Sequence, residues 1–501
     1  MASLFAEKAR YFNPTLALSV TLIAVSTFNY GFDNQAFATT QSMDPFTRRF
    51  GVYDEKTKDW ILEPYWLSLF NSLNYIGFAA GVFAGSLVSS RWGRKWCMFG
   101  MSCYALITAT ISVTSQTREQ IMAARVLNYI YVGMELSVVP TFQSEIVPAP
   151  VRGLVVGSYQ FSLVLGGLVI NSICYRTSSL PDDRAWRIPI GLFYLVPSIV
   201  LSLIWFVPES PRWLLRQDRI EEARSNLQRL RSGAFSDDEI EAEFHDLCTA
   251  LEKEEEQGTF VELFQGINLK RSFIVAGVNF FQQTTGQAFV SQYGAVYVRS
   301  LKLMNPSLFS MCGSAVSLVT ISLSLLVTDR FGRRTLLMVS SIMMAAVLLS
   351  FGGLGIEQPV PVPRKRGLVG LMLVFAIAGG SGWLPLTYVV ATEVSALRLR
   401  DHSARFGFGV NVLFNFLVSF SVPYLISDQY AALNSKVGFI FGSIAMLAFV
   451  FVWLCVPECK GKTLEQIDTL FQRGTRMRDF SKGVGERYDE DEKTIDVSVK
   501  A

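Results

Sequence analysis

Long apolar segments recur along the 501-residue chain and constrain its fold more than any other feature does. A helix rises about 1.5 Å per residue, so about 20 apolar residues cross the hydrocarbon core of a bilayer. The segments therefore predict an all-α membrane protein with twelve transmembrane helices. The predicted spans are 14–38, 65–90, 96–115, 120–141, 153–175, 188–207, 272–298, 307–328, 335–355, 367–391, 406–426 and 437–456.

The composition agrees with a membrane protein and argues against several other classes. Half of the residues are hydrophobic and 17% are charged, whereas soluble domains average roughly 25% charged residues. The net charge of +3 gives no strong basic field, so we expect no nucleic-acid partner. The two histidines lie far apart and the seven cysteines form no CxxC pair, which argues against a metal site. Because no nucleophile–base set is recognisable, we predict no enzyme activity, no catalytic residue and no cofactor.

Lysine and arginine concentrate in the short loops on one side of the predicted membrane, and this side is assigned to the cytoplasm. An even number of spans places both termini on the same side. The predicted parts are a cytoplasmic N-terminus (1–13), a first six-helix bundle (14–207), a cytoplasmic linker with short amphipathic helices (208–271), a second six-helix bundle (272–456) and a largely disordered cytoplasmic tail (457–501).

Three features of the first half recur in the second half at nearly constant offsets. A basic loop built around a glycine recurs after 239 residues, an acid near the end of a span after 248, and a Pro-Glu pair after 249. The matching positions are 90–95 with 329–334, Glu145 with Glu393, and Glu209 with Glu458. The chain is therefore predicted to contain two homologous halves, an arrangement in which a substrate site lies near the membrane midplane.

Several short motifs occur in a characteristic order. They are Arg125 and the stretches 31–33, 91–95, 140–148, 208–212, 282–283, 329–334 and 457–464. This set, which extends from about Gly31 to Phe471, resembles the sugar-porter family of the major facilitator superfamily, and fungal carriers including the α-glucoside group in particular. The resemblance implies two pseudo-symmetric six-helix bundles that move a sugar-like substrate by alternating access. It also implies a monomer in the lipid bilayer of the plasma membrane or, alternatively, the vacuole.

Two charged residues inside predicted spans indicate how transport is driven. Asp33 and Arg125 each lie about five residues, or roughly 8 Å, below the outer membrane boundary. An unpaired charge inside a membrane is costly, so the two side chains are expected to face each other, either as a static ion pair or as a proton relay. The resemblance favours the relay, because proton-coupled members of the family carry this acid and this arginine. Protons are therefore an expected partner.

Glu135 is a second acid, ten residues deeper than Arg125 in the same predicted span. The family usually has an uncharged residue at this position, so the resemblance gives it no role. Two interpretations remain open: the carboxyl is solvated near the cytoplasmic mouth, or it binds a polar or cationic group of the substrate.

Amide and aromatic side chains are the candidates for binding the substrate. Amides both donate and accept hydrogen bonds, as sugar hydroxyls require, and aromatic rings cover apolar sugar faces. Each candidate could instead form an ordinary interhelical hydrogen bond. The candidates are Gln160, Gln282, Gln283, Gln287, Tyr293, Tyr388 and Asn411.

Several positions depart from the pattern of the hexose carriers. The departures are Tyr129, Tyr131, Ala288, Tyr388 and Val412. A disaccharide, a sugar acid, a polyol or a secondary metabolite is therefore an alternative to glucose. Export or facilitated passage of another metabolite, and a sugar sensor that does not transport, are the alternative functions.

Charged residues at the cytoplasmic ends of both halves are predicted to form a gate. Such a network could close when the carrier faces outward and separate when it faces inward. Glu145 is expected to meet Arg91, and Ser90 replaces an aspartate expected from the family, so the first half of the gate should be the weaker half. The predicted gate residues are Arg91, Arg94, Glu145, Arg152, Glu209, Asp329, Arg330, Arg333, Glu393, Arg400 and Glu458.

Overall fold

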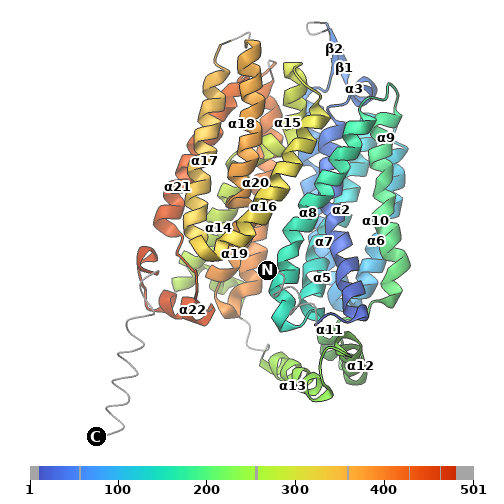
Figure 1. Ribbon diagram of the computed structural model, residues 1–501, viewed down its shortest axis with the longest axis vertical. Helices are drawn as coiled ribbons and strands as arrows, with labels where there is room; N and C mark the ends of the chain where they lie inside the picture. The colour runs from blue at the N-terminus through green and yellow to red at the C-terminus, as the bar shows by residue number, and fades with distance from the viewer. Residues whose placement is uncertain are drawn as a thin grey trace. The chain divides into compact units, whose positions relative to one another are not determined.

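The computed structural model describes residues 11–55, 58–253, 258–357, 360–427, 429–462 and 464–480. This part of the chain is mainly helical, with one short two-stranded hairpin (Figure 1). Its contacts divide it into two compact units. The first unit contains Met1–Glu256, Ser291–Leu318 and Ser419–Tyr424, and the second contains Gln257–Val290, Val319–Val418 and Leu425–Ala501.

The first unit is built on long helices that begin at clear capping signals. Asn13 accepts a hydrogen bond from the amide of Leu16 at the start of α2, and Thr117 caps α7 in the same way. Prolines occupy the first turns of α2, α4 and α8, where the missing amide costs nothing. The helices are α2 (Pro14–Thr40), α4 (Pro64–Ser72), α5 (Asn74–Trp92), α6 (Arg94–Val113), α7 (Arg118–Ile146), α8 (Ala149–Thr177), α9 (Arg184–Gly191) and α10 (Leu195–Leu203).

Small residues let two pairs of these helices pack closely. A side chain at Gly31 of α2 would collide with the carbonyl of Leu163 in α8, and one at Gly81 of α5 would collide with the carbonyl of Ile130 in α7. Small residues at membrane helix interfaces allow such backbone approach. This close packing holds α2 against α8 and α5 against α7, and α2 and α7 carry the charged residues of the site.

The short elements α3 (Asp44–Phe50), β1 (Val52–Asp54) and β2 (Asp59–Ile61) follow α2, and the antiparallel strands place Val52 opposite Ile61. Arg299, near the end of α15 (Gln287–Leu301), forms ion pairs with Asp44 at 2.9 Å and with Asp59 at 3.5 Å. These contacts hold the end of α15 against this segment of the first unit.

Three helices of the segment after α10 form a small core of their own. They are α11 (Pro211–Arg216), α12 (Ile220–Arg231) and α13 (Asp237–Lys253). Trp213, Leu227 and Phe244 are among the side chains buried between them. Arg231 pairs with Glu243 through two hydrogen bonds of 2.8 and 2.9 Å and donates a third, of 2.8 Å, to the carbonyl of Ile146 at the end of α7. The helices are thus attached to the first unit.

The second unit contains most of the later helices. The predicted span 272–298 is divided at Gly286, which has a φ of +91° and separates α14 from α15. Another break, at Ser381 and Gly382, separates α18 from α19. The helices after α15 are α16 (Pro306–Phe331), α17 (Arg333–Leu354), α18 (Val362–Gly380), α19 (Trp383–Val394), α20 (Arg400–Ile426), α21 (Val437–Cys455) and α22 (Leu464–Gln472), and α14 is Gly266–Thr284.

In the described part of the chain, nine helical segments are long and apolar enough to cross a membrane. The other three predicted spans, 120–141, 153–175 and 272–298, coincide with α7, α8 and the pair α14–α15. Polar side chains explain the lower hydropathy of two of them: α7 carries Arg125 and Glu135, and α14 carries a run of amides. The apolar length of these segments was sufficient to predict them as spans in spite of their polar residues.

The tail is more ordered than its composition suggested. Arg271 of α14 is buried, and its Nη1 lies 2.6 Å from the Oδ1 of Asp468 in α22. Phe480 is fully buried and its ring packs 5.0 Å from that of Phe471. Packing therefore continues to residue 480, beyond the predicted start of the disordered tail. The remainder of that prediction falls on 481–501, which lie outside the described residues.

Candidate functional site

Asp33 of α2 and Arg125 of α7 meet inside the first unit. Nη1 of Arg125 lies 2.9 Å from Oδ1 of Asp33, and the two residues are 5% and 2% exposed. The other carboxylate oxygen accepts a hydrogen bond from the amide of Asn128, one turn along α7 from Arg125. The structure therefore brings the two predicted residues together and adds Asn128 as a third member of the network.

Aromatic residues surround the Arg125 guanidinium. It lies over the rings of Phe37 and Tyr129, at 4.1 and 4.5 Å from their centroids, and Nη2 donates to the Tyr129 hydroxyl at 3.1 Å. Tyr129 in turn donates to Oδ1 of Asn34 at 3.0 Å. Cation–π contacts of this kind stabilise a desolvated guanidinium. Tyr129, one of the departures from the family pattern, thus completes the environment of the ion pair.

Glu135 lies deeper on the same face of α7 and is only 2% exposed, so it is not solvated. Ser26 of α2 donates a 2.6 Å hydrogen bond to its Oε1. One turn away, Asn29 of α2 donates to the hydroxyl of Tyr131 at 3.2 Å. Polar side chains of α2 and α7 therefore meet at three successive levels, of which the sequence predicted only the Asp33 level.

An amide network lies within the second unit. Asn411 of α20 donates to Oε1 of Gln282 at 2.6 Å and to Oδ1 of Asn279 at 3.3 Å. Gln283 donates back to Oδ1 of Asn411 at 3.0 Å. The structure brings three predicted substrate residues together and adds Asn279. Gln283 is only partly buried, unlike Gln282 and Asn411, which are both 5% exposed.

The remaining predicted substrate residues do not join this network. Gln287 is half-buried at the start of α15, and Tyr388 of α19 exposes 39% of its surface. Gln160 is half-buried on α8 in the first unit. Tyr293 is 1% exposed and donates to the carbonyl of Ser419 at 2.5 Å, inside the part of α15 that belongs to the first unit. Because its buried hydroxyl already donates to a backbone carbonyl, Tyr293 is the weakest of the substrate candidates.

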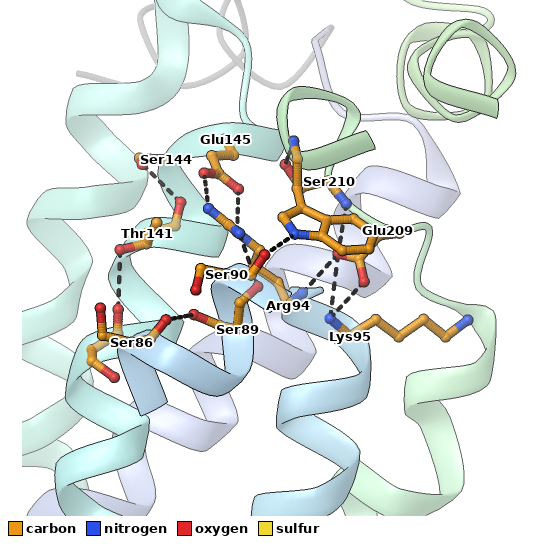
Figure 2. Close-up of polar contacts among 12 residues, drawn as sticks. Ser86, Ser89, Ser90, Arg94, Lys95, Thr141, Ser144, Glu145, Glu209 and Ser210 are labelled. Atoms are coloured by element: carbon orange, nitrogen blue, oxygen red, sulfur yellow. Dashed lines mark hydrogen bonds and ion pairs between the residues drawn. The ribbon is translucent and has the colours of Figure 1, made fainter. Parts of the chain in front are cut away.

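The first half of the predicted gate is built around Arg94, at the start of α6 (Figure 2). Its Nε and Nη2 donate to the two oxygens of Glu145 at 2.9 and 2.8 Å, a bidentate pair. Glu209 caps α6 by accepting from the backbone amides of Arg94 and Lys95, both at 3.0 Å. Burial raises the pKa of the Glu209 carboxyl, although these hydrogen bonds and one from the amide of Ser210 oppose the shift.

The second half repeats this geometry within the second unit. Arg333, at the start of α17, pairs with Glu393 at 3.1 Å, and the Glu458 carboxylate accepts from the amides of Arg333 and Arg334 at 3.0 and 3.1 Å. The matching sequence positions therefore fold into matching sites. The first half of the gate was expected to be held more weakly than the second half. The ion pairs indicate the opposite, because the Arg94–Glu145 pair is both shorter and more buried than the Arg333–Glu393 pair.

The other predicted gate residues do not take part in these two networks, or their side chains are not described. Arg91 is exposed, and the partner of Glu145 is Arg94, so the expected Arg91–Glu145 pair is not formed. Arg330 and Arg400 are exposed. The side chains of Arg152 and Asp329 lie outside the described residues.

The sequence reasoning missed several polar residues of the site, namely Ser26, Asn29, Asn128, Tyr129, Tyr131 and Asn279. Helical spacing contained the signal: Ser26, Asn29 and Asp33 fall on one face of a helix, and so do Arg125, Asn128 and Glu135. Asn279 precedes Gln282 and Gln283 by about one turn. A search for polar residues on the same face as a membrane-buried charge would have found most of them.

The fold and these sites define a multi-pass membrane transporter of the major facilitator type. The chain belongs to the family described as sugar (and other) transporter, whose model matches residues 19–471. The family is one of transporters rather than enzymes.

Several known proteins are similar to this chain. The high-affinity hexose transporter HXT7 of Saccharomyces cerevisiae is 27% identical over 500 residues, which cover 96% of this chain and 87% of that protein. The MFS transporter fmqE of Aspergillus fumigatus is 26% identical over 477 residues, which cover 93% and 88%. The structure of the proton:xylose symporter XylE of E. coli, bound to 6-bromo-6-deoxy-D-glucose, is similar in fold, with a TM-score of 0.71, 22% identity and coverage of 92% and 100%.

Proposed function

We propose that this protein is a proton-coupled carrier that imports a sugar or a sugar-like molecule across the plasma membrane by alternating access. The observation that carries the proposal is the buried Asp33–Arg125 pair, with its 2.9 Å contact and the added hydrogen bond from Asn128. Proton coupling is also supported by the similar fold of XylE, which is a proton:xylose symporter. The similar hexose transporter supports a sugar substrate.

The pair has the chemistry of a proton site. A carboxylate is favoured while a guanidinium lies beside it, and it takes up a proton more readily once the guanidinium moves away. In the described structure Asp33 is held by both Arg125 and Asn128. A rearrangement of α2 against α7 that breaks these contacts would bind a proton, and its reversal would release the proton.

The amide network supports a substrate with several hydroxyl groups. Gln282, Gln283 and Asn411 offer donors and acceptors without a charge, and they hold one another in position. Mutual hydrogen bonding keeps these side chains ordered before substrate arrives, which lowers the entropy cost of binding. A neutral polyhydroxylated molecule fits this set better than an anion does.

Uptake by Asp33→Asn in a yeast strain without its own carriers tests the proposal. Radiolabelled D-glucose, D-xylose and maltose would be supplied with and without a protonophore. We expect the wild type to concentrate at least one of them and the protonophore to abolish this uptake. Asp33→Asn should lose concentrative uptake while it still equilibrates the substrate.

Asp182→Asn is the matched control for this test. It makes the same substitution in an exposed pair, in which Arg184 Nε lies 2.8 Å from Asp182 Oδ2. This variant should transport like the wild type, because exposed ion pairs contribute little. Concentrative, protonophore-sensitive uptake by Asp33→Asn would disprove the role of the pair.

A second candidate is facilitated passage or export of a related metabolite such as a polyol or a sugar acid. Two departures from the hexose-carrier pattern favour it. Ala288, which is 2% exposed, replaces the asparagine of hexose carriers, and Tyr388 is the second departure. Uptake of a polyol that is insensitive to the protonophore would support this candidate instead.

A further inference from the structure

We infer that Glu135 is a second proton-binding site, connected to Asp33 by a ladder of polar side chains between α2 and α7. The inference rests on the proposed proton coupling and adds an inner site through which the proton continues. The ladder has three levels: Asp33 with Arg125 and Asn128, Asn29 with Tyr131, and Ser26 with Glu135.

Regular helical spacing produces the ladder. Ser26, Asn29 and Asp33 are separated by three and four residues on α2, and each meets a partner on α7. The two helices run in opposite directions, so the order is reversed on α7. The step from Asn29 to Asp33 is one helical turn, about 6 Å along the axis, which one water molecule can bridge. All of these side chains are 5% exposed or less.

The two acids differ in their partners. Asp33 is held by a guanidinium and an amide, whereas Oε1 of Glu135 accepts one bond from the neutral Ser26 hydroxyl, and Oε2 has no hydrogen-bond partner among the described residues. Burying an ionised carboxylate without a cation or further donors costs several kcal/mol. The environment of Glu135 therefore fits a neutral, protonated carboxyl, and that of Asp33 fits an ionised one.

The atoms left without a partner at the two inner levels are both acceptors, Oδ1 of Asn29 and Oε2 of Glu135. What these levels lack is therefore a donor, and a proton on Glu135 supplies one. The charged group that acts on Glu135 is Asp33 of α2, and its titratable neighbour on α7 is Tyr131. Among the described residues of α4, α5, α6, α8 and α11, which also pack against α7, none adds a charge that acts on it.

Hydroxyl groups provide the route between the acids. Asn29 donates to the Tyr131 hydroxyl at 3.2 Å, and Ser26, which interacts with Tyr131, donates to Glu135 at 2.6 Å. A hydroxyl can accept a proton on one side while it donates another on the other side. When a proton leaves Asp33, its carboxylate pairs again with Arg125 while the carboxylate of Glu135 becomes a carboxylic acid, so the total charge of the ladder is unchanged. Release toward the cytoplasm restores the Glu135 carboxylate.

Glu135→Gln and Tyr131→Phe test the ladder in proteoliposomes, with the radiolabelled sugar that the uptake panel identifies. Glutamine keeps an acceptor for Ser26 but binds no proton, and phenylalanine interrupts the hydroxyl chain without touching either acid. Both variants should keep sugar exchange within about twofold of the wild type and lose uptake driven by a pH gradient by about tenfold or more, as expected for a removed proton-transfer group. Glu135→Asp should retain part of the driven uptake.

Tyr104→Phe is the matched control, because its hydroxyl donates to the carbonyl of Leu127 in α7 at 3.0 Å, away from the ladder. It should leave driven uptake unchanged. Infrared difference spectra of the purified protein at neutral pH provide a readout that does not depend on transport. The wild type should show the absorption of a protonated carboxylic acid, and Glu135→Gln should lack it.

The outcomes separate this inference from the proposed function. A wild type whose uptake ignores the pH gradient would disprove the proposed coupling itself. If the wild type is coupled and Glu135→Gln is equally coupled, the inner proton site is wrong but the proposed function stands. The same conclusion follows if both proteins show the same carboxylic-acid absorption. Loss of both exchange and driven uptake in folded Glu135→Gln would also overturn it and would make Glu135 a substrate contact.

Discussion

At the scale of single residues, glycine determines the geometry of both halves of the gate. Gly93 and Gly332 have φ values of +95° and +87°, which residues with a side chain rarely adopt. A Cβ atom at either position would also collide with the carboxylate that caps the next helix, Glu209 or Glu458. The glycine in each basic loop is therefore required both by the backbone conformation and by the cap.

Gly93→Ala should destabilise the protein by about 1–3 kcal/mol, because it adds left-handed strain and displaces Glu209. The apparent melting temperature in detergent measures the effect. Gly100→Ala, in the helix that follows Gly93, is the matched control, since nothing lies within 4 Å of the added methyl group. It should be neutral or slightly stabilising, and an equal loss in both variants would contradict the argument.

The pH dependence of stability should differ between two capping glutamates. Burial raises the pKa of Glu209, so its contribution to stability is present below the unfolded pKa of about 4.3 and is lost as the pH rises through the folded pKa. Hydrogen bonds from the amide and hydroxyl of Thr259 lower the pKa of the exposed Glu262, so its contribution is present above the unfolded pKa and is lost as the pH falls through the folded pKa.

Melting temperatures of Glu209→Gln and Glu262→Gln, each compared with the wild type between about pH 3 and pH 7, measure these contributions. The difference between variant and wild type should become more positive with rising pH for Glu209→Gln and more negative for Glu262→Gln. The same trend in both variants would show that the assignment of the two shifts is wrong.

At the scale of elements, the sequence predicted which helices cross the membrane but not where they break. Apolar length identifies a span, but the breaks at Gly286 and at Ser381–Gly382 depend on backbone torsion and on packing against neighbours. The sequence also did not determine which arginine of the gate pairs with Glu145. Arg91 and Arg94 are both near Glu145 in the predicted topology, and only the turn at Gly93 decides that Arg94, at the start of α6, forms the pair.

Polar residues inside spans were the best guide to the candidate site. Asp33 and Arg125 could be paired from depth alone, because a buried charge requires a partner. The partners that surround them could not be identified from the spans, because Asn128 and Tyr129 are common interior residues and their roles depend on which face of α7 meets α2. Helical spacing restricts that choice to a few positions, and packing selects among them.

At the scale of the whole molecule, the internal duplication is a repeat of geometry as well as of sequence. In each unit, an arginine at the start of a helix pairs with one acid, and the backbone of the same turn is capped by a second acid. The two copies differ in burial. The Arg94 and Glu145 side chains are 7% and 6% exposed, and those of Arg333 and Glu393 are 17% and 18% exposed.

This difference predicts unequal consequences of the same substitution in the two halves. Glu145→Gln leaves a buried guanidinium without its carboxylate and should cost about 3–5 kcal/mol, whereas Glu393→Gln should cost less because water screens Arg333 better. Melting temperatures of both variants, with the exposed Arg91→Gln as a control expected within about 0.5 kcal/mol of the wild type, measure the asymmetry. A greater loss in Glu393→Gln would instead agree with the weaker first half expected from Ser90, and it would show that contacts outside the Arg–Glu pairs determine how strongly each half of the gate is held.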